Sequence, residues 1–163
     1  MYLMNVYIGS DHSGFKLKTC ILNEFKGVVL KQNHKDIVNY INLVDVCCLY
    51  GETCDYPDSV VEVCDMVKED KGSIGILITD TGIGMSIVAN KINGISCALC
   101  HNEYMAEMSK KHNNSNILAL GERIINKEMA FKILLTFINN EFEGNIHIQK
   151  LNKIIGIENN YIY

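Results

Sequence analysis

Residues 74–86 constrain the fold more than any other stretch, because an apolar run, a glycine-rich turn and a helical pattern follow one another there. The run at 74–78 is typical of a strand that is buried on both faces. Polar and glycine positions follow from Thr79 to Gly84, and apolar residues then recur at helical spacing as far as Ile92. Such a turn aims backbone N–H groups at one point, which suits phosphates, carboxylates or developing oxyanions. The same pattern also fits an ordinary strand-to-helix turn whose glycines serve the backbone alone.

Strand-like and helix-like segments alternate along the rest of the chain. Strands are predicted in apolar runs at 3–8, 28–30, 43–49, 95–100 and 116–120. Helices are predicted at 15–25, 57–67, 83–92, 103–111 and 127–138, with a last one at 141–157 that is interrupted near Gly144. The polar, helix-compatible residues 31–42 are interpreted as an insertion. This alternation favours an α/β fold in one domain, residues 1–163, with a parallel sheet between two layers of helices.

The composition is that of an ordinary globular protein, with 48% hydrophobic and 21% charged residues. A formal net charge of −4 gives no support for nucleic-acid binding. No apolar run reaches the roughly 20 residues needed to cross a bilayer, and the first residues lack the basic stretch of a signal peptide. Seven cysteines, several of them in apolar runs, suit a reducing compartment. We therefore expect a cytoplasmic protein with no nucleic-acid or membrane partner.

Cys97 and Cys100 form a CxxC pair that His101 follows directly. A redox pair would open a helix, whose dipole lowers the pKa of the thiol, but this pair lies in a run typical of a buried strand. A zinc site would need a second pair of ligands at a suitable distance, and the sequence offers none. We interpret the two cysteines as structural and predict no metal site.

Polar side chains follow several predicted strands at the point where each strand ends. Asp11 and His12 follow the first strand, Thr79 and Asp80 follow the central one, and Arg123 follows the strand at 116–120. Because open α/β sheets bind their ligands at the carboxyl ends of the strands, we expect these side chains to converge. Arg123 is the only arginine of the chain, and its planar guanidinium suits an anion. A surface ion pair is the alternative for Arg123.

Five ordered motifs resemble one family, the type B ribose-5-phosphate isomerases, which are grouped with the subunits of galactose-6-phosphate isomerase. The motifs are Gly9–Lys18, Asp55–Asp58, Thr81–Lys91, His112–Arg123 and Phe142–His147. The resemblance implies a Rossmann-like three-layer α/β/α sandwich that works as a homodimer or homotetramer with active sites shared between subunits. It places the C-terminal helix at the dimer interface and implies neither a metal nor an organic cofactor.

The reaction that the resemblance implies is the interconversion of ribose 5-phosphate and ribulose 5-phosphate through an enediolate, a step of the pentose phosphate pathway. A histidine suits the opening of the sugar ring near neutral pH. A base then moves a proton between C1 and C2 while N–H donors stabilise the enediolate oxygen. Two alternatives stay open: an isomerase for a six-carbon sugar such as allose or galactose 6-phosphate, and a phosphosugar-binding protein without catalysis.

The family motifs also imply roles for individual residues. His112 is expected to open the sugar ring, and Arg123 and Lys150 are expected to bind phosphate. The substrate-binding positions implied in this way are Asp11, His12, Tyr56, Thr81, Gly82, Ile83, Gly84, Asn113, Arg123 and Lys150. A structural role is the alternative for two of the residues, since His112 could be a helix C-cap and Asp11 a helix N-cap.

The chain departs from the family pattern at the position of the base. Many members have a cysteine followed by a glycine at the end of the central strand, and the cysteine transfers the proton. This chain has Thr79 and Asp80 there, and it has Met85 where other members use a glutamate. A threonine hydroxyl has no useful basicity unless it is activated, whereas an aspartate can act beside a carbonyl. We therefore predict Asp80 slightly ahead of Thr79 as the base.

A second departure concerns the phosphate. Two arginines that are usual in the last helix of the family correspond to Ile146 and Lys150. A lysine keeps the positive charge but lacks the planar fork of an arginine, and an isoleucine keeps neither. The sequence therefore predicts weaker phosphate binding, or compensation by lysines elsewhere.

Overall fold

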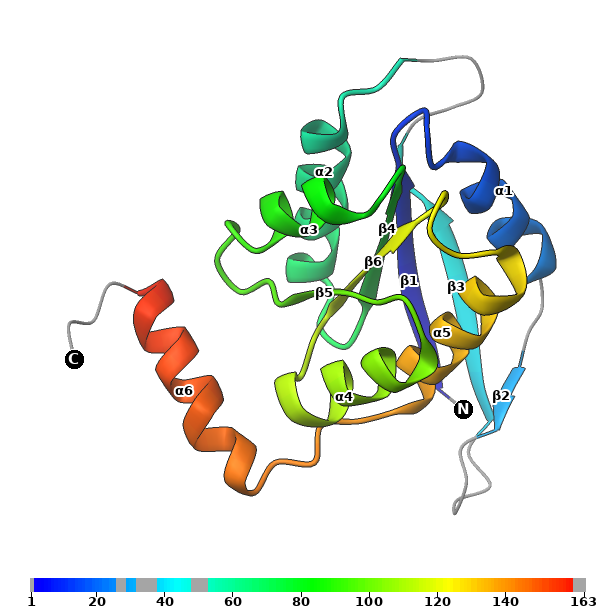
Figure 1. The fold of residues 1–163 in the computed structure, drawn as a ribbon. Coiled ribbons are helices and arrows are strands. Elements are labelled where there is room, and N and C mark those ends of the chain that lie inside the picture. Colours follow the sequence, from blue (N-terminus) through cyan, green and yellow to red (C-terminus); the bar gives the residue numbers. More distant parts are fainter. Residues whose placement is uncertain (1, 26–28, 32–37, 48–52, 160–163) are drawn as a thin grey trace.

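A six-stranded sheet forms the centre of the computed structural model, which describes residues 2–25, 29–31, 38–47 and 53–159 (Figure 1). The strands are β1 (Tyr2–Ser10), β2 (Val29–Lys31), β3 (Val38–Asp45), β4 (Ile74–Thr79), β5 (Cys97–Leu99) and β6 (Ile117–Gly121). They lie in the order β2-β3-β1-β4-β6-β5, and every pair from β3 to β5 is parallel. Only the short edge strand β2 is antiparallel to its neighbour. The predicted α/β fold with a parallel sheet is confirmed.

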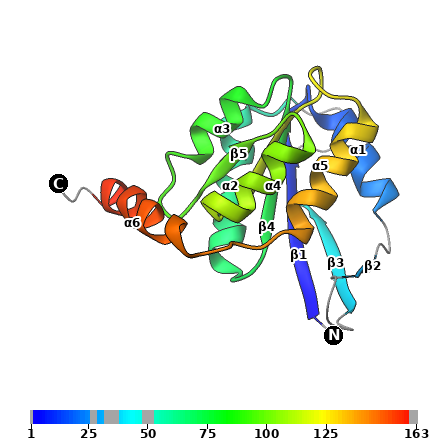
Figure 2. The same cartoon turned by 60° about the horizontal axis from the view of Figure 1, so that its bottom comes forward.

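Helices cover both faces of the sheet (Figures 1 and 2). On one face lie α1 (Phe15–Glu24), α4 (Glu103–Asn113) and α5 (Lys127–Asn139), and on the other lie α2 (Tyr56–Glu69) and α3 (Ile83–Ala89). These layers form the Rossmann-like sandwich that the family resemblance implies. Helix α6 (Ile146–Glu158) stands apart from the sheet in both views. Within the described part of the chain, no helix has the length and apolar character required to cross a membrane.

Strand β4 joins the two halves of the core. All six of its residues are buried, as its continuous apolar run predicts. Ile76 and Ile78 belong to the buried cluster under α1, α4 and α5, whereas Leu77 belongs to the cluster under α2 and α3. Because alternate side chains anchor β4 on both faces, the turn that follows Thr79 has a fixed starting point.

The carboxyl ends of β1, β4 and β6 lie side by side at one edge of the sheet. Ser10 is in register with Ile78, and Thr79 is in register with Gly121. The loop after β1 rests on the end of β4, because a Cβ at Gly14 would overlap the carbonyl of Ile78. The segments that follow three strands are thus brought together, as the position of their polar residues predicts.

Residues 38–42 form the first part of β3, and 39–42 pair in parallel with β1. The interpretation of 31–42 as helix-compatible is therefore wrong for 38–42 and for Lys31, which ends β2, while 32–37 lie outside the described residues. The physical reason is that the ladder to β1 satisfies the backbone hydrogen bonds of a polar segment whatever its local propensity. The strand predicted at 43–49 correspondingly ends earlier, at Asp45.

The last helix begins later than its predicted start at 141. Gly144 and Asn145 have backbone φ angles of 69° and 48°, which a right-handed helix cannot include. Helix α6 therefore starts at Ile146 and continues to Glu158. None of its residues is buried in the chain.

Candidate active site

Asp11 organises the turn between β1 and α1. Its Oδ1 accepts hydrogen bonds from the backbone N–H of Ser13 at 3.0 Å, from Ser13 Oγ at 2.7 Å and from the N–H of Gly14 at 3.0 Å. Only 6% of Asp11 is exposed. The residue at the N-cap of α1 is Gly14, so the alternative of Asp11 as the N-cap is wrong, although its carboxylate holds the preceding turn.

Thr79 faces this carboxylate from the end of β4. Its Oγ1 donates a hydrogen bond of 2.6 Å to Asp11 Oδ2, and it lies 3.3 Å from Ser13 Oγ. Hydrogen bonds to a carboxylate are short and strong because the acceptor is charged. Thr79 is 7% exposed, so the pair is almost shielded from water. The end of β4 therefore presents a hydroxyl that is engaged with a buried carboxylate.

Asp80 turns toward a different partner. Its Oδ1 lies 2.7 Å from Arg123 Nε in an ion pair, and among the described residues this buried oxygen accepts no hydrogen bond. The side chains of Asp80 and Arg123 are 43% and 80% exposed, so solvent screens this ion pair. Most of the guanidinium remains accessible to an anion. The structure thus shows the surface ion pair that was the alternative for Arg123, at the edge where we expected the anion.

The turn after β4 is tight for steric reasons. Gly82 has a φ of 78°, and a Cβ there would lie 2.5 Å from Leu99 Cδ1. Thr81 Oγ1 accepts a hydrogen bond of 3.3 Å from the N–H of Ile83. The ring of Tyr56 lies against the next glycine, since a Cβ at Gly84 would be 3.1 Å from its Cε2. The structure therefore gathers the four predicted turn residues and Tyr56 beside Thr79 and Asp80.

Met85 and His12 occupy opposite environments. Met85 is fully buried in the cluster under α2 and α3, so its position cannot present a side chain to a substrate. His12 is exposed, directly after Asp11. Position 85 therefore offers no group to a substrate, whereas the exposed imidazole of His12 is available at the rim of the carboxyl edge.

His112 and Asn113 lie at the opposite edge of the sheet. They are the last two residues of α4. Asn116, three residues after Asn113, accepts a hydrogen bond from the N–H of Gly75 at the start of β4, which places the end of α4 at this edge. Thr79 lies four residues after Gly75 along β4, which corresponds to about 13 Å at the usual rise per residue of a strand. One chain therefore does not bring His112 together with the carboxyl-edge residues. The C-cap of α4 is Asn114, so the alternative of His112 as the C-cap is wrong.

The imidazole of His112 stacks on that of His147 at the start of α6, with ring centres 4.1 Å apart and planes 13° apart. Glu143 completes a group whose candidate ligand atoms lie within 4.8 Å of one another. Nitrogen lone pairs lie in the ring plane, so two nearly parallel stacked rings do not point at one metal position. Lys111 Nζ is also 3.5 Å from Glu143 Oε1. The arrangement therefore fits a metal ion poorly.

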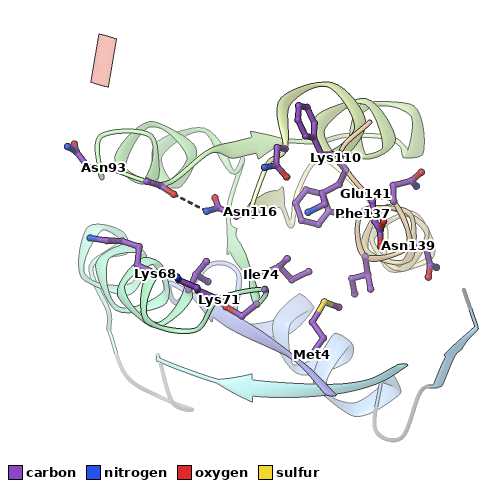
Figure 3. A pocket seen from close by; sticks show the side chains of 18 residues that line it. Met4, Lys68, Lys71, Ile74, Asn93, Lys110, Asn116, Phe137, Asn139 and Glu141 are labelled. Carbon is purple, nitrogen blue, oxygen red and sulfur yellow. Dashed lines mark hydrogen bonds between the residues drawn. The ribbon is translucent and has the colours of Figure 1, made fainter. Parts of the chain in front are cut away.

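A cavity of about 1000 Å³ also lies at the amino edge of the sheet (Figure 3). It lies among Met4, Lys71, Asn116 and Phe137, and it contains none of the predicted site residues. Lys110 points over the ring of Phe137, with its Nζ 5.0 Å from the ring centre, and donates a hydrogen bond to Ser115 O. Burial lowers the pKa of Lys110. We interpret this lysine as part of the packing of α4 on α5.

Cys97 and Cys100 are free thiols in β5 and directly after it. Burial raises the pKa of Cys100 to about 11 and that of Cys97 further. A thiol with such a pKa is almost entirely protonated near neutral pH, and the thiolate is the reactive form. These values agree with the interpretation of both cysteines as structural.

Sequence reasoning missed the residues that hold the site in place. Ser13 bridges Asp11 and Thr79, and the spacing of Asp11 and Ser13 is typical of an Asx turn, a signal that was available. Glu122 Oε2 accepts a hydrogen bond of 2.9 Å from the N–H of Leu17 in the first turn of α1. These contacts tie the loops after β1, β4 and β6 into one unit.

An ion pair with a buried lysine supports the same edge from β3. Lys18 of α1 has no exposed surface, and its Nζ lies 2.6 Å from Asp45 Oδ1 and also bonds to Cys47 O. Asp45 ends β3 and its side chain is 38% exposed. The sequence carries no local signal for this pair, because its members are 27 residues apart.

Comparisons with known proteins agree with this geometry. A family model described as Ribose/Galactose Isomerase matches residues 6–154. A Rickettsia conorii relative with the provisional name sugar phosphate isomerase is 42% identical over 154 residues, 94% of this chain and 99% of the relative. The D-erythrulose-4-phosphate isomerase of Pectobacterium atrosepticum is 36% identical over 93% of each chain. The structure of the ribose-5-phosphate isomerase B of Clostridium thermocellum matches with a TM-score of 0.84 at 40% identity, over 98% of this chain and 100% of that one.

The chain therefore belongs to the ribose/galactose isomerase family, whose members named above are sugar phosphate isomerases. The resemblance drawn from the five motifs is confirmed. The relatives are named for sugars with different numbers of carbon atoms, erythrulose and ribose. Family membership therefore does not identify the sugar that this chain uses.

Proposed function

We propose that this chain interconverts ribose 5-phosphate and ribulose 5-phosphate through an enediolate, as a step of the pentose phosphate pathway. The observation that carries the proposal is the group at the carboxyl edge, where Asp11, Thr79 and Arg123 follow or end three neighbouring strands. A carboxylate, a hydroxyl and an accessible guanidinium together suit a small phosphorylated sugar. The Clostridium thermocellum enzyme, which carries this activity in its name and closely matches the fold, supports the choice of sugar.

The proposed carboxyl-edge half of the site binds the sugar and moves the proton. Asp11 and His12 hold hydroxyls or phosphate, and Arg123 binds phosphate through its exposed guanidinium. The backbone of Thr81, Gly82, Ile83 and Gly84 stabilises the enediolate oxygen, and Tyr56 lines the pocket above this turn. The proton is transferred between C1 and C2 at the end of β4, beside Thr79 and Asp80.

The proposed second half of the site lies at the amino edge. There His112 opens the sugar ring, Asn113 contacts a hydroxyl or the enediolate, and the exposed Lys150 of α6 binds phosphate. Since about 13 Å of β4 separates this edge from Thr79, the two halves meet only if they come from different copies of the chain. We therefore propose a homodimer, or a homotetramer built from such dimers, with shared active sites.

Helix α6 supports the proposed dimer. Within the chain its ends are tied down, by the stack of His147 on His112 and by the N–H of Gly94 on Glu158 Oε1 at 2.7 Å. None of its residues is fully buried, and its exposed isoleucines are Ile146, Ile148, Ile154, Ile155 and Ile157. Apolar side chains gathered on one exposed helix are typical of an interaction surface. The proposed partner for this surface is a second copy of the chain.

Further proposals concern organisation and location. We propose that residues 1–163 act as one domain, since both buried clusters share the strands of a single sheet. A cytoplasmic location is proposed because the described cysteines are free thiols, which suit a reducing compartment.

Turnover of a panel of sugar phosphates tests the proposed function. We expect ribose 5-phosphate to have a kcat/KM at least about tenfold above that of erythrose 4-phosphate and of allose and galactose 6-phosphates, because one carbon in a closed site is worth roughly that factor. A six-carbon substrate with the higher kcat/KM would instead favour the alternative isomerase. Saturable binding of ribose 5-phosphate without turnover would favour the phosphosugar-binding protein.

A further inference from the structure

We infer that Asp11 is the proton acceptor of the isomerisation and that it works through the hydroxyl of Thr79, an inference that rests on the proposed function. The family resemblance implies that the residue at the end of β4, here Thr79, transfers the proton. A threonine hydroxyl cannot do this alone near neutral pH, because it needs an adjacent base to activate it. The structure places one carboxylate, that of Asp11, within hydrogen-bond distance of this hydroxyl.

The other candidate positions at the end of β4 are less suitable. The Asp80 carboxylate is held by the loop after β6, because its Oδ1 lies 2.7 Å from Arg123 Nε, and the hydroxyl of Thr79 donates to Asp11 and not to Asp80. Met85 has no basic group and is fully buried among apolar side chains. Asp11 and Thr79 are therefore the pair whose geometry suits proton transfer.

The two oxygens of Asp11 have different tasks. Oδ1 accepts three hydrogen bonds, two from Ser13 and one from the N–H of Gly14, which fix the orientation of the carboxylate. Oδ2 accepts the hydroxyl of Thr79 at 2.6 Å. The Thr79 proton is thus directed at Oδ2, and a lone pair of Thr79 Oγ1 is left for the carbon-bound proton of a substrate. A carboxylate held in this way can receive a proton without rearranging.

The proposed step balances without a further reactant. The proton on C2 of the open-chain aldose passes to Thr79 Oγ1 while the hydroxyl proton of Thr79 passes to Asp11 Oδ2. The electron pair of the broken C–H bond forms the C1=C2 bond, and the carbonyl π pair moves to O1, which gives the enediolate. A proton then passes from Thr79 Oγ1 to C1 while Asp11 Oδ2 returns a proton to Thr79, and the hydroxyl proton of O2 passes to O1. An aspartate carboxylate serves as the base beside a carbonyl in other enzymes.

A double-mutant cycle separates this relay from a structural role of Asp11. Asp11→Asn keeps an oxygen for the three donors at Oδ1 but replaces Oδ2 with an amide that cannot accept a proton. Thr79→Cys supplies a thiol that can accept the proton directly. We expect Asp11→Asn to lower kcat for ribose 5-phosphate by about 10²–10⁴-fold with Thr79 in place, and by less than about tenfold in the Thr79→Cys background.

Two variants of Thr79 test the hydroxyl itself. Thr79→Ser keeps the hydroxyl and should keep most of the activity, whereas Thr79→Val has nearly the same shape and should lose about as much as Asp11→Asn. Thermal unfolding verifies that each variant is folded. A loss from Asp11→Asn that is equal in both backgrounds, or an active Thr79→Val, would overturn the relay. An inactive wild type with an active Thr79→Cys would also overturn it, whereas inactivity of both would contradict the proposed function.

Discussion

Replacement of His112 by alanine is expected to lower kcat for ribose 5-phosphate by about 10²–10⁴-fold, because the proposed acid/base for ring opening is lost. His112 ends α4 and carries an imidazole stacked on that of His147, so the ring is held in place before a substrate binds. The substrate is mostly cyclic, and the cyclic form has no carbonyl beside which a proton could be removed. Steady-state turnover of ribose 5-phosphate measures the loss.

The reverse reaction provides the control for the His112→Ala variant. Ribulose 5-phosphate cannot close a five-membered ring, because its O5 carries the phosphate, so no ring has to be opened before C1 loses a proton. Exchange of the C1 proton of ribulose 5-phosphate with deuterated solvent should therefore fall by less than about tenfold in this variant. If exchange and turnover fell by the same large factor, His112 would act in proton transfer or binding instead of ring opening.

The second large effect is on stability. Asp45→Asn is expected to lower the free energy of unfolding by about 3 kcal/mol, because it removes a carboxylate from the fully buried ammonium of Lys18. Lys18→Met should cost less, since the Asp45 side chain is 38% exposed and water can solvate it. Urea unfolding measures both values, with an unchanged m-value expected for each variant.

An exposed ion pair provides the matched control for Asp45→Asn. Asp65 Oδ1 lies 3.8 Å from Lys68 Nζ, and both side chains are largely exposed. Asp65→Asn should change the free energy of unfolding by no more than about 0.5 kcal/mol. Similar small effects at Asp45 and Asp65 would show that the Lys18–Asp45 pair contributes no more to the free energy of unfolding than a surface pair.

The fold was predictable wherever apolar patterns decide it. The buried run at 74–78 and the alternation of strands and helices identify the sheet and its two helical layers. The polar stretch at 38–42 was not predictable, because its pairing with β1, and not its own composition, makes it a strand. The start of α6 depends on two residues with positive φ, Gly144 and Asn145, and glycine is the residue type that adopts such a backbone most readily.

The residues of the site were more predictable from the sequence than the contacts between them. Asp80 and Arg123 follow neighbouring strands whose ends are in register, so their ion pair follows from the sheet order, which the sequence does not state. The hydrogen bond of Thr79 to Asp11 likewise depends on β1 lying next to β4. That His112 lies at the amino edge follows from its place at the end of a helix that leads into β6, a topological signal that was available.

The central claim is that one active site combines the carboxyl edge of one chain with the amino edge of another, and complementation tests it most directly. His112→Ala and Asp11→Asn chains, each inactive alone, are unfolded together in equal amounts and refolded. Half of the dimers are then hybrids with one intact site of two, so activity should return to about a quarter of the wild-type value. Hybrid dimers identified by mass spectrometry that show no activity above the separate variants would contradict the claim.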